Sequence, residues 1–173
     1  MRAAVVAAFA MLLFTANATH AQSLVERGKY LATIGDCIDC HTPRYFFGQP
    51  DMTRYLGGSD VGFQIPDMGI FVGPNLTPDK ETGLGSWTDE QIGKALTTGE
   101  RPDGRILAPI MPWHALAHLT KPDLAALVAY LRSLPPVKNK VPGPFGSDDT
   151  STVPIMKVIF PAGVAPPSSP PQK

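Results

Sequence analysis

The residues with the clearest chemistry are two cysteines and a histidine in the run Cys37-Ile38-Asp39-Cys40-His41, which holds both cysteines of the chain. Two thiols at this spacing on one helical turn can each add to a haem vinyl group. The imidazole next to them can then reach the iron. The C-x-x-C-H pattern therefore predicts one covalent haem c, with thioethers at Cys37 and Cys40 and His41 as an axial ligand.

Other uses of this cysteine pair fit the sequence less well. A thioredoxin-like redox pair needs a βαβ context, and loops rich in Pro and Gly surround this one. A zinc site needs four ligands, usually from two such pairs, and the chain has no further cysteine. A structural disulfide remains an alternative, although so small a closed loop gains little stability.

The second axial position has several candidates. We favour Met111, because Pro109 and Pro112 stiffen its loop and lower the cost of holding a thioether against iron. His114 and His118 are alternatives, because imidazole also binds haem iron; they could equally face solvent or the haem propionates. The remaining methionines beyond residue 21 lie in turn-rich or tail segments and rank lower: Met52, Met68 and Met156.

Three segments begin with capping signals that predict helix N-termini. The first helix is expected from Ser23 to about Ile34, where Gly35 can end it in a left-handed conformation. The other two are expected from Thr88 to Gly99 and from Thr120 to Pro135.

Apolar faces on these helices predict a helical core. In the first helix, Leu24, Gly28 and Leu31 share one face, and Gly28 would let another helix approach closely. The third carries a longer apolar stripe: Leu124, Leu127, Val128 and Leu131. We therefore expect an all-α domain with about three main helices around one haem.

Two further segments lie outside the helical pattern. Residues 44–75 are rich in aromatics, and apolar alternation at 61–65 and 70–72 predicts a small β-hairpin insertion. It would either cover a haem edge or form a surface loop with its own small core. Residues 139–173 are expected to be a Pro-rich extended tail, whose apolar run 153–160 could dock on a partner or on the domain itself.

The first 21 residues have the pattern of a secretory signal peptide. A short positive start precedes an apolar run over residues 3–14, and small-residue cleavage sites end at Ala18 and Ala21. Such a run is too short to span a bilayer. We therefore expect cleavage and a periplasmic location.

With 15 basic and 15 acidic residues, the formal net charge is zero, and no basic stripe predicts nucleic-acid binding.

The sequence resembles class I cytochrome c domains, and more closely the haem domains in cytochrome subunits of membrane-associated alcohol and gluconate dehydrogenases. The expected domain is residues 22–138, and the resemblance covers roughly residues 24–138 of it. The runs that carry the resemblance are GKYL at 28–31, the haem motif, PNLTPD at 74–79, GSWT at 85–88, RPDGR at 101–105, MPW at 111–113 and LRSLPP at 131–136.

The resemblance implies a cytochrome c fold, thioethers at Cys37 and Cys40, and axial ligation by His41 and Met111. Those subunits usually contain three haem domains, whereas this chain has one motif. We interpret the chain as a mono-haem electron carrier and not an enzyme. Its expected redox partners are an exported dehydrogenase and a terminal acceptor or oxidase, and any membrane contact is expected through a partner.

The alternative function is a haem enzyme or gas-binding protein, which would need an open or displaceable sixth position. Ligation by Met111 discriminates between the two functions.

Propionate groups of a haem would need N–H donors close to the methionine loop. The candidates for this role are Trp87, Trp113, Arg101 and Arg105.

Overall fold

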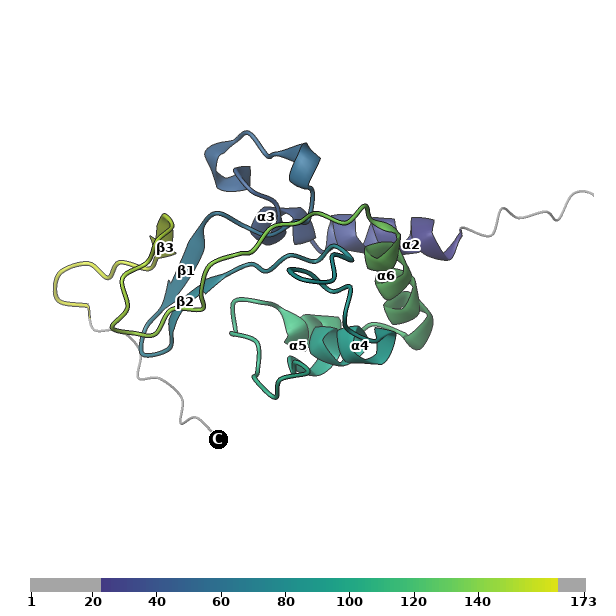
Figure 1. The fold of residues 1–173 in the computed structure, drawn as a ribbon. Coiled ribbons are helices and arrows are strands. Elements are labelled where there is room, and N and C mark those ends of the chain that lie inside the picture. The colour runs from purple at the N-terminus through teal and green to yellow at the C-terminus, as the bar shows by residue number, and fades with distance from the viewer. Residues whose placement is uncertain (1–22, 165–173) are drawn as a thin grey trace, which may run out of the picture.

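A computed structural model describes residues 23–164 of the protein (Figure 1). In chain order, its elements are α2 (Leu24–Ile34), α3 (Cys37–His41), the 3-10 turns η1 (Tyr45–Phe47) and η2 (Met52–Arg54), β1 (Gly62–Ile65), β2 (Gly69–Val72), α4 (Asp89–Thr98), α5 (Trp113–Leu116), α6 (Lys121–Ser133) and β3 (Ile155–Lys157). The expected signal peptide, residues 1–21, lies outside the described residues. Within residues 23–164, none of the helices has the length and apolarity needed to cross a membrane.

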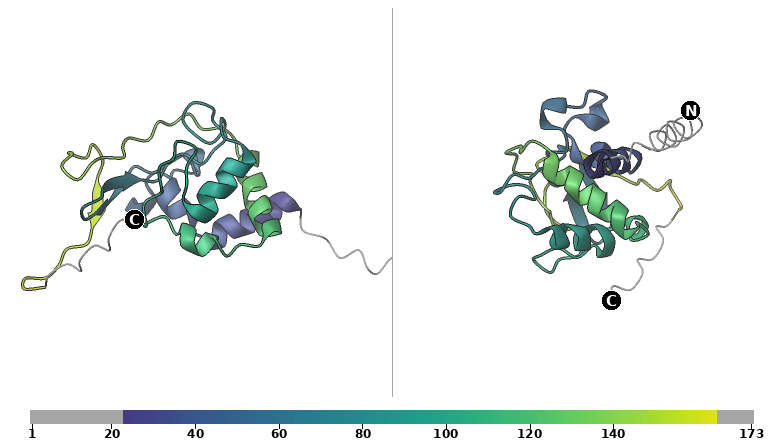
Figure 2. Two further views of the ribbon diagram at one scale, coloured as in Figure 1. Left: turned by 90° about the horizontal axis from the view of Figure 1, so that it is seen from below. Right: turned by 90° about the vertical axis from the view of Figure 1, so that its right-hand side faces the viewer.

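The core forms where α6 packs across α2 and alongside α4 (Figures 1 and 2). Gly28 of α2 is buried against α6, as its position on the apolar face predicted, whereas Leu24 of the same face is 53% exposed. Leu56 and Leu84 join the buried cluster from loops between the helices. Its other members lie in α2, α4 and α6: Leu31, Ala32, Ile92, Leu96, Ala126, Leu127, Val128, Tyr130 and Leu131.

The helix boundaries follow the capping signals closely. Capping boxes are present at Ser23 and at Thr88, and the Thr120 hydroxyl accepts a hydrogen bond from the backbone N–H of Asp123. Gly99 ends α4 in the left-handed region with φ of 74°. The expectation for Gly35 is wrong: its φ is −81°, and the left-handed residue is the next one, Asp36, with φ of 54°.

The insertion before α4 contains the predicted hairpin. Strands β1 and β2 pair antiparallel with Phe63 opposite Phe71. The Phe46 ring of η1 stands edge-on to that of Phe63 with centroids 5.5 Å apart, so the insertion has aromatic contacts of its own. A third strand, which was not predicted, joins the other side of β1: β3 runs parallel to it, in the sheet order β2-β1-β3.

The chain after α6 stays on the surface of the domain up to β3, and part of the expected tail is therefore docked. In Figure 1 it runs from α6 across the molecule to the sheet. Val137 and Asn139 hydrogen-bond to loop residues 57–82, and Phe145 forms an isolated bridge with Ile70. Prolines prevent this segment from forming a helix, but polar side chains of the domain satisfy its backbone groups.

Candidate haem site

The two cysteines lie on the short helix α3, and both are free thiols of intermediate exposure. Burial is the main cause that raises the pKa of Cys37, to about 11, and it also raises the pKa of Cys40, so both are neutral thiols at neutral pH. The backbone of Gly73 touches this helix directly, because a Cβ at Gly73 would lie 1.6 Å from the Cys40 carbonyl oxygen.

His41, at the end of α3, is 5% exposed. Its ring Nδ1 lies 2.8 Å from the carbonyl oxygen of Pro74, and since a carbonyl only accepts, Nδ1 must carry the proton. The other ring nitrogen, Nε2, therefore keeps its lone pair for a metal. Burial lowers the pKa of His41 and outweighs the opposing Pro74 carbonyl, which favours the neutral, ligating form.

Met111 lies in the loop that leads into α5 and packs against the same buried cluster as Cys37. Two backbone hydrogen bonds hold it on either side: its N–H donates to Ala108 at 3.0 Å, and its carbonyl accepts from Trp113 at 2.8 Å. A thioether fixed in this way meets an iron with little further loss of conformational freedom.

Of the alternative ligands, four are exposed and one lies in the hairpin turn. His114 and His118 are exposed, and the His114 ring stacks on Trp113 with centroids 3.4 Å apart. Met52 is 58% exposed and Met156 is 46% exposed, whereas Met68 is half-buried in the hairpin turn. Of these three methionines, none is among the hydrophobic side chains packed against the buried cluster, whereas Cys37 and Met111 are.

Two of the expected propionate donors have a buried nitrogen that makes no hydrogen bond. Among the side chains of residues 23–164, the buried N–H donors without a hydrogen bond are Arg101 Nε and Trp113 Nε1. Arg101 Nε is 3.5 Å from a carboxylate oxygen of Asp103, close enough for an ion pair but without hydrogen-bond geometry. The indole of Trp113 lies against Gly99, where a Cβ would come within 2.9 Å of Nε1. Unpaired buried donors are costly, so they point to an anionic acceptor that fills this place.

Neither of the other two candidates has a buried side-chain donor without a hydrogen bond. Arg105 is exposed and donates from Nε and Nη2 to Asp103 at 3.0 and 2.8 Å. Trp87 is half-buried, with the Arg101 guanidinium 5.1 Å from its ring centroid, and its carbonyl accepts from Arg132. Arg105 is therefore a surface residue, and Trp87 supports Arg101 from below as a cation–π partner.

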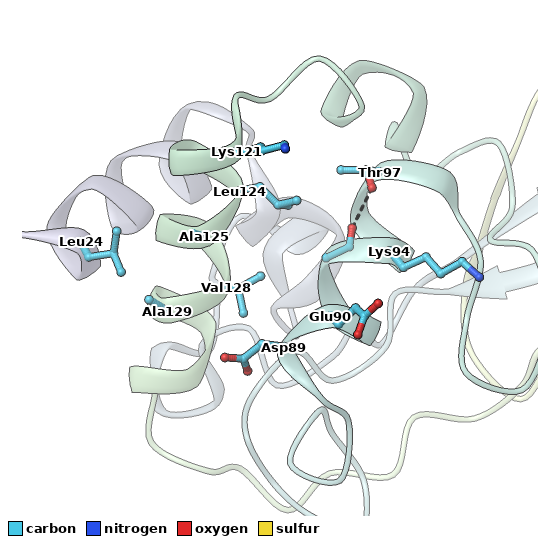
Figure 3. A pocket seen from close by; sticks show the side chains of 11 residues that line it. Leu24, Asp89, Glu90, Lys94, Thr97, Lys121, Leu124, Ala125, Val128 and Ala129 are labelled. Carbon is cyan, nitrogen blue, oxygen red and sulfur yellow. Dashed lines mark hydrogen bonds between the residues drawn. The ribbon is translucent and has the colours of Figure 1, made fainter.

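A groove on the described chain lies elsewhere, between α4 and α6 (Figure 3). It measures about 590 Å³ and contains none of the candidate haem ligands. Leu24 stands at one end, and the floor is made by α6 and α4 residues that include Leu124, Ala125 and Val128. It is thus a surface groove between two core helices and separate from the haem motif.

The sequence analysis gave no role to three residues that shape the surroundings of His41. Pro74 supplies the carbonyl that orients the ring, Gly73 allows contact with α3, and Gly58 donates its N–H to the His41 carbonyl at 2.8 Å. Of these three, only Pro74 belongs to a run that carries the resemblance, PNLTPD at 74–79; Gly73 and Gly58 lie outside such runs. The residues present therefore fit a haem: two neutral thiols, an imidazole with a free Nε2, and unpaired donors for anionic groups.

Comparison with known proteins agrees with this geometry. The family model for cytochrome c matches residues 25–135. The chain is 38% identical over 143 residues to the alcohol dehydrogenase (quinone) cytochrome c subunit of Gluconobacter oxydans, covering 79% of this chain and 28% of that protein. It is 37% identical over 113 residues to the fructose dehydrogenase cytochrome subunit of Gluconobacter japonicus, covering 64% and 22%.

A third relative is the gluconate 2-dehydrogenase cytochrome c subunit of Pantoea cypripedii, 38% identical over 108 residues, with 62% and 22% covered. The chain thus spans about a quarter of the length of these relatives. All three are named as cytochrome subunits of dehydrogenases, and the cytochrome c family implies covalent haem c. The chain belongs to the cytochrome c family and is homologous to cytochrome c subunits of alcohol, fructose and gluconate dehydrogenases.

Proposed function

We propose that this protein is a periplasmic mono-haem cytochrome that passes single electrons between an exported dehydrogenase and a terminal acceptor or oxidase. The observation that carries the proposal is the hydrogen bond from His41 Nδ1 to Pro74, which leaves Nε2 free on the helix that also bears both thiols. A single C-x-x-C-H motif in the sequence supports one haem.

In this proposal each side chain has a defined role. Cys37 and Cys40 would hold the haem through thioethers, and His41 and Met111 would supply the ligands to its iron. Arg101 and Trp113 donate their unpaired N–H groups to the propionates. The haem, when bound, supplies a one-electron ferric–ferrous couple, and a thioether ligand in apolar surroundings favours its reduced state. His41 is buried and Met111 is half-buried against the packed core, so both side chains would move little when the oxidation state changes.

The location and the partner follow from different observations. The signal-peptide pattern of residues 1–21 supports export to the periplasm. The relatives are named as subunits of dehydrogenases, which supports a dehydrogenase as the electron donor.

Attachment of the haem is tested on the exported protein, produced together with a cytochrome maturation system. Intact mass should show removal of residues 1–21 and one added haem, and the alkaline-pyridine spectrum should be that of haem c with two thioether bonds. A Cys37→Ala variant should give the spectrum of a single thioether. Colourless wild-type protein, or haem that organic solvent extracts, would rule the proposal out.

The Met111 ligand is tested by substitution with alanine. Met111→Ala should lose the weak long-wavelength ferric band of methionine ligation and should bind carbon monoxide rapidly in the reduced state. Met156→Ala is the matched control, because it removes an exposed methionine and should leave both properties unchanged. If wild-type protein binds carbon monoxide rapidly and tightly at neutral pH, a gas-binding or enzymatic haem protein is the better description.

A further inference from the structure

The backbone and the ring of His41 are held from two sides. On one side, the ring Nδ1 donates to the Pro74 carbonyl at 2.8 Å. On the other, the His41 carbonyl accepts from the N–H of Gly58 at 2.8 Å. The loops that carry Pro74 and Gly58 therefore set both the position of the residue and the rotation of its imidazole.

The segment after α6 fastens the loop that carries Pro74. Asn75, the next residue, is 2% exposed, and its side-chain N–H donates to the carbonyl of Val137 at 2.6 Å. The N–H of Val137 in turn donates to the Thr77 hydroxyl at 3.0 Å. Val137 is thus hydrogen-bonded through both of its backbone groups to the loop that orients His41.

The same segment fastens the turn that carries Gly58. The Asn139 side chain donates to the carbonyl of Gly57 at 2.8 Å, and its backbone N–H donates to the Thr82 hydroxyl at 3.0 Å. Val141 covers Gly58 so closely that a Cβ there would lie 2.2 Å from a Val141 methyl carbon. Alternate residues of one extended segment therefore contact both supports of His41.

We infer that residues 135–157, here called the C-terminal strap, position the His41 imidazole, with Asn139 as the main positioning residue. This inference rests on the proposed ligation of iron by His41. Apart from its first residue, the strap lies beyond the residues that the cytochrome c family model matches, 25–135. A short, well-aligned bond from Nδ1 to a carbonyl raises the basicity of the imidazole, and a more basic ligand stabilises the ferric state. The strap therefore keeps the reduction potential lower than it would be with a loosely held imidazole.

The test is Asn139→Ala in the haem-loaded, full-length mature protein. Removing the side chain deletes its bond to Gly57 and frees the turn that supports Gly58. We expect the potential to rise, with at least a threefold change in the reduction equilibrium constant, roughly 28 mV at 59 mV per tenfold for one electron. The iron–histidine stretching frequency, measured by resonance Raman on the ferrous form of a Met111→Ala background, should fall.

Ser151→Ala is the matched control, because it also deletes two hydrogen bonds of the strap, those between Ser151 and Val153, but far along the chain from the contacts of His41. It should leave the potential and the iron–histidine frequency unchanged. If Asn139→Ala does not accumulate, Val141→Ala loosens the cover over Gly58 while it keeps every hydrogen bond, and the same two changes are expected.

Two results would overturn the inference. One is a lower melting temperature in Asn139→Ala with an unchanged potential, which would make the strap a purely stabilising segment. The other is a lower potential with an unchanged iron–histidine frequency, which would indicate entry of water and not a looser imidazole. The wild-type pyridine spectrum is independent of both, so failure of haem attachment is recognised separately.

Discussion

Gly28 of α2 lies against the backbone of Ala126 in α6, and a Cβ at Gly28 would be 1.9 Å from the Ala126 carbonyl oxygen. We expect Gly28→Ala to force the two helices apart, because a backbone carbonyl cannot move out of the way as a side chain can. Overpacking of this kind typically costs about 3 kcal/mol, and better helix propensity returns only about 1 kcal/mol. The free energy of unfolding, measured in denaturant, should therefore fall by about 2 kcal/mol.

The matched control is Gly93→Ala in α4. A Cβ at Gly93 would be 3.5 Å from a methyl carbon of Leu124, an ordinary contact distance. Helix propensity should then dominate and raise the stability by up to about 1 kcal/mol. If both substitutions change the free energy of unfolding equally, the close approach of α2 to α6 does not depend on the absence of a side chain at Gly28.

The ion pair between Arg27 and Asp123 predicts a pH dependence of stability. A hydrogen bond from Arg27 is the main cause that lowers the pKa of Asp123 below its ordinary value, and a bond from the Thr120 hydroxyl adds to it. The unfolded chain thus binds a proton at a higher pH than the folded one. The contribution of this carboxylate is complete above about pH 4 and is lost as the pH falls through the folded pKa.

Thermal unfolding between pH 6 and pH 3 measures this contribution. Asp123→Asn should lower the melting temperature at pH 6 and make its decline toward pH 3 shallower. Arg27→Gln should have the same two effects, and the double variant should add little to either, because both substitutions remove one interaction. A wild-type slope in both single variants would show that the pair does not contribute.

The helices and their ends could be predicted from the sequence because the signals are local. The boxes at Ser23 and Thr88 and the left-handed Gly99 depend on residues within one turn of each other. The error at Gly35 has a local cause as well. Asp36 takes the left-handed conformation, which short polar side chains tolerate, so the glycine was not required to do so.

The supports of the candidate site could not be predicted, because they join residues far apart in the chain. The bond from Asn75 to Val137 spans 62 residues, and the bond from Asn139 to Gly57 spans 82. Proline content correctly indicated that the segment after α6 is not helical, but composition does not tell a docked strand from a free tail. The parallel pairing of β3 with β1 depends on the same distant contacts.

Arg132 connects α6 to the segment that precedes α4. Its guanidinium donates to the carbonyls of Leu84 and Trp87 and to the carboxylate of Asp89. Arg132→Met keeps much of the apolar stem but leaves two carbonyls without their charged donor, which should cost about 2 kcal/mol of stability. Lys138→Met is the control: its pair with Glu81 is exposed on both sides and should matter little. A loss in Lys138→Met as large as that in Arg132→Met would contradict this interpretation.

Arg101 and Arg105 lie four residues apart on one loop, and Arg101→Gln and Arg105→Gln remove the same charge. Only Arg101 has a buried donor without a hydrogen bond, whereas Arg105 is exposed and bonded to Asp103. If Arg101 binds a propionate, its loss leaves a negative charge near the iron that stabilises the ferric state. The midpoint potential of Arg101→Gln should then fall by about 40 mV, or roughly 1 kcal/mol, with a steeper dependence on pH as the propionate titrates.

Arg105→Gln is the control and should change the midpoint potential by much less, because solvent screens an exposed charge. Equal shifts in the two variants would mean that Arg101 acts only through its net charge, and the unpaired donor would need another acceptor.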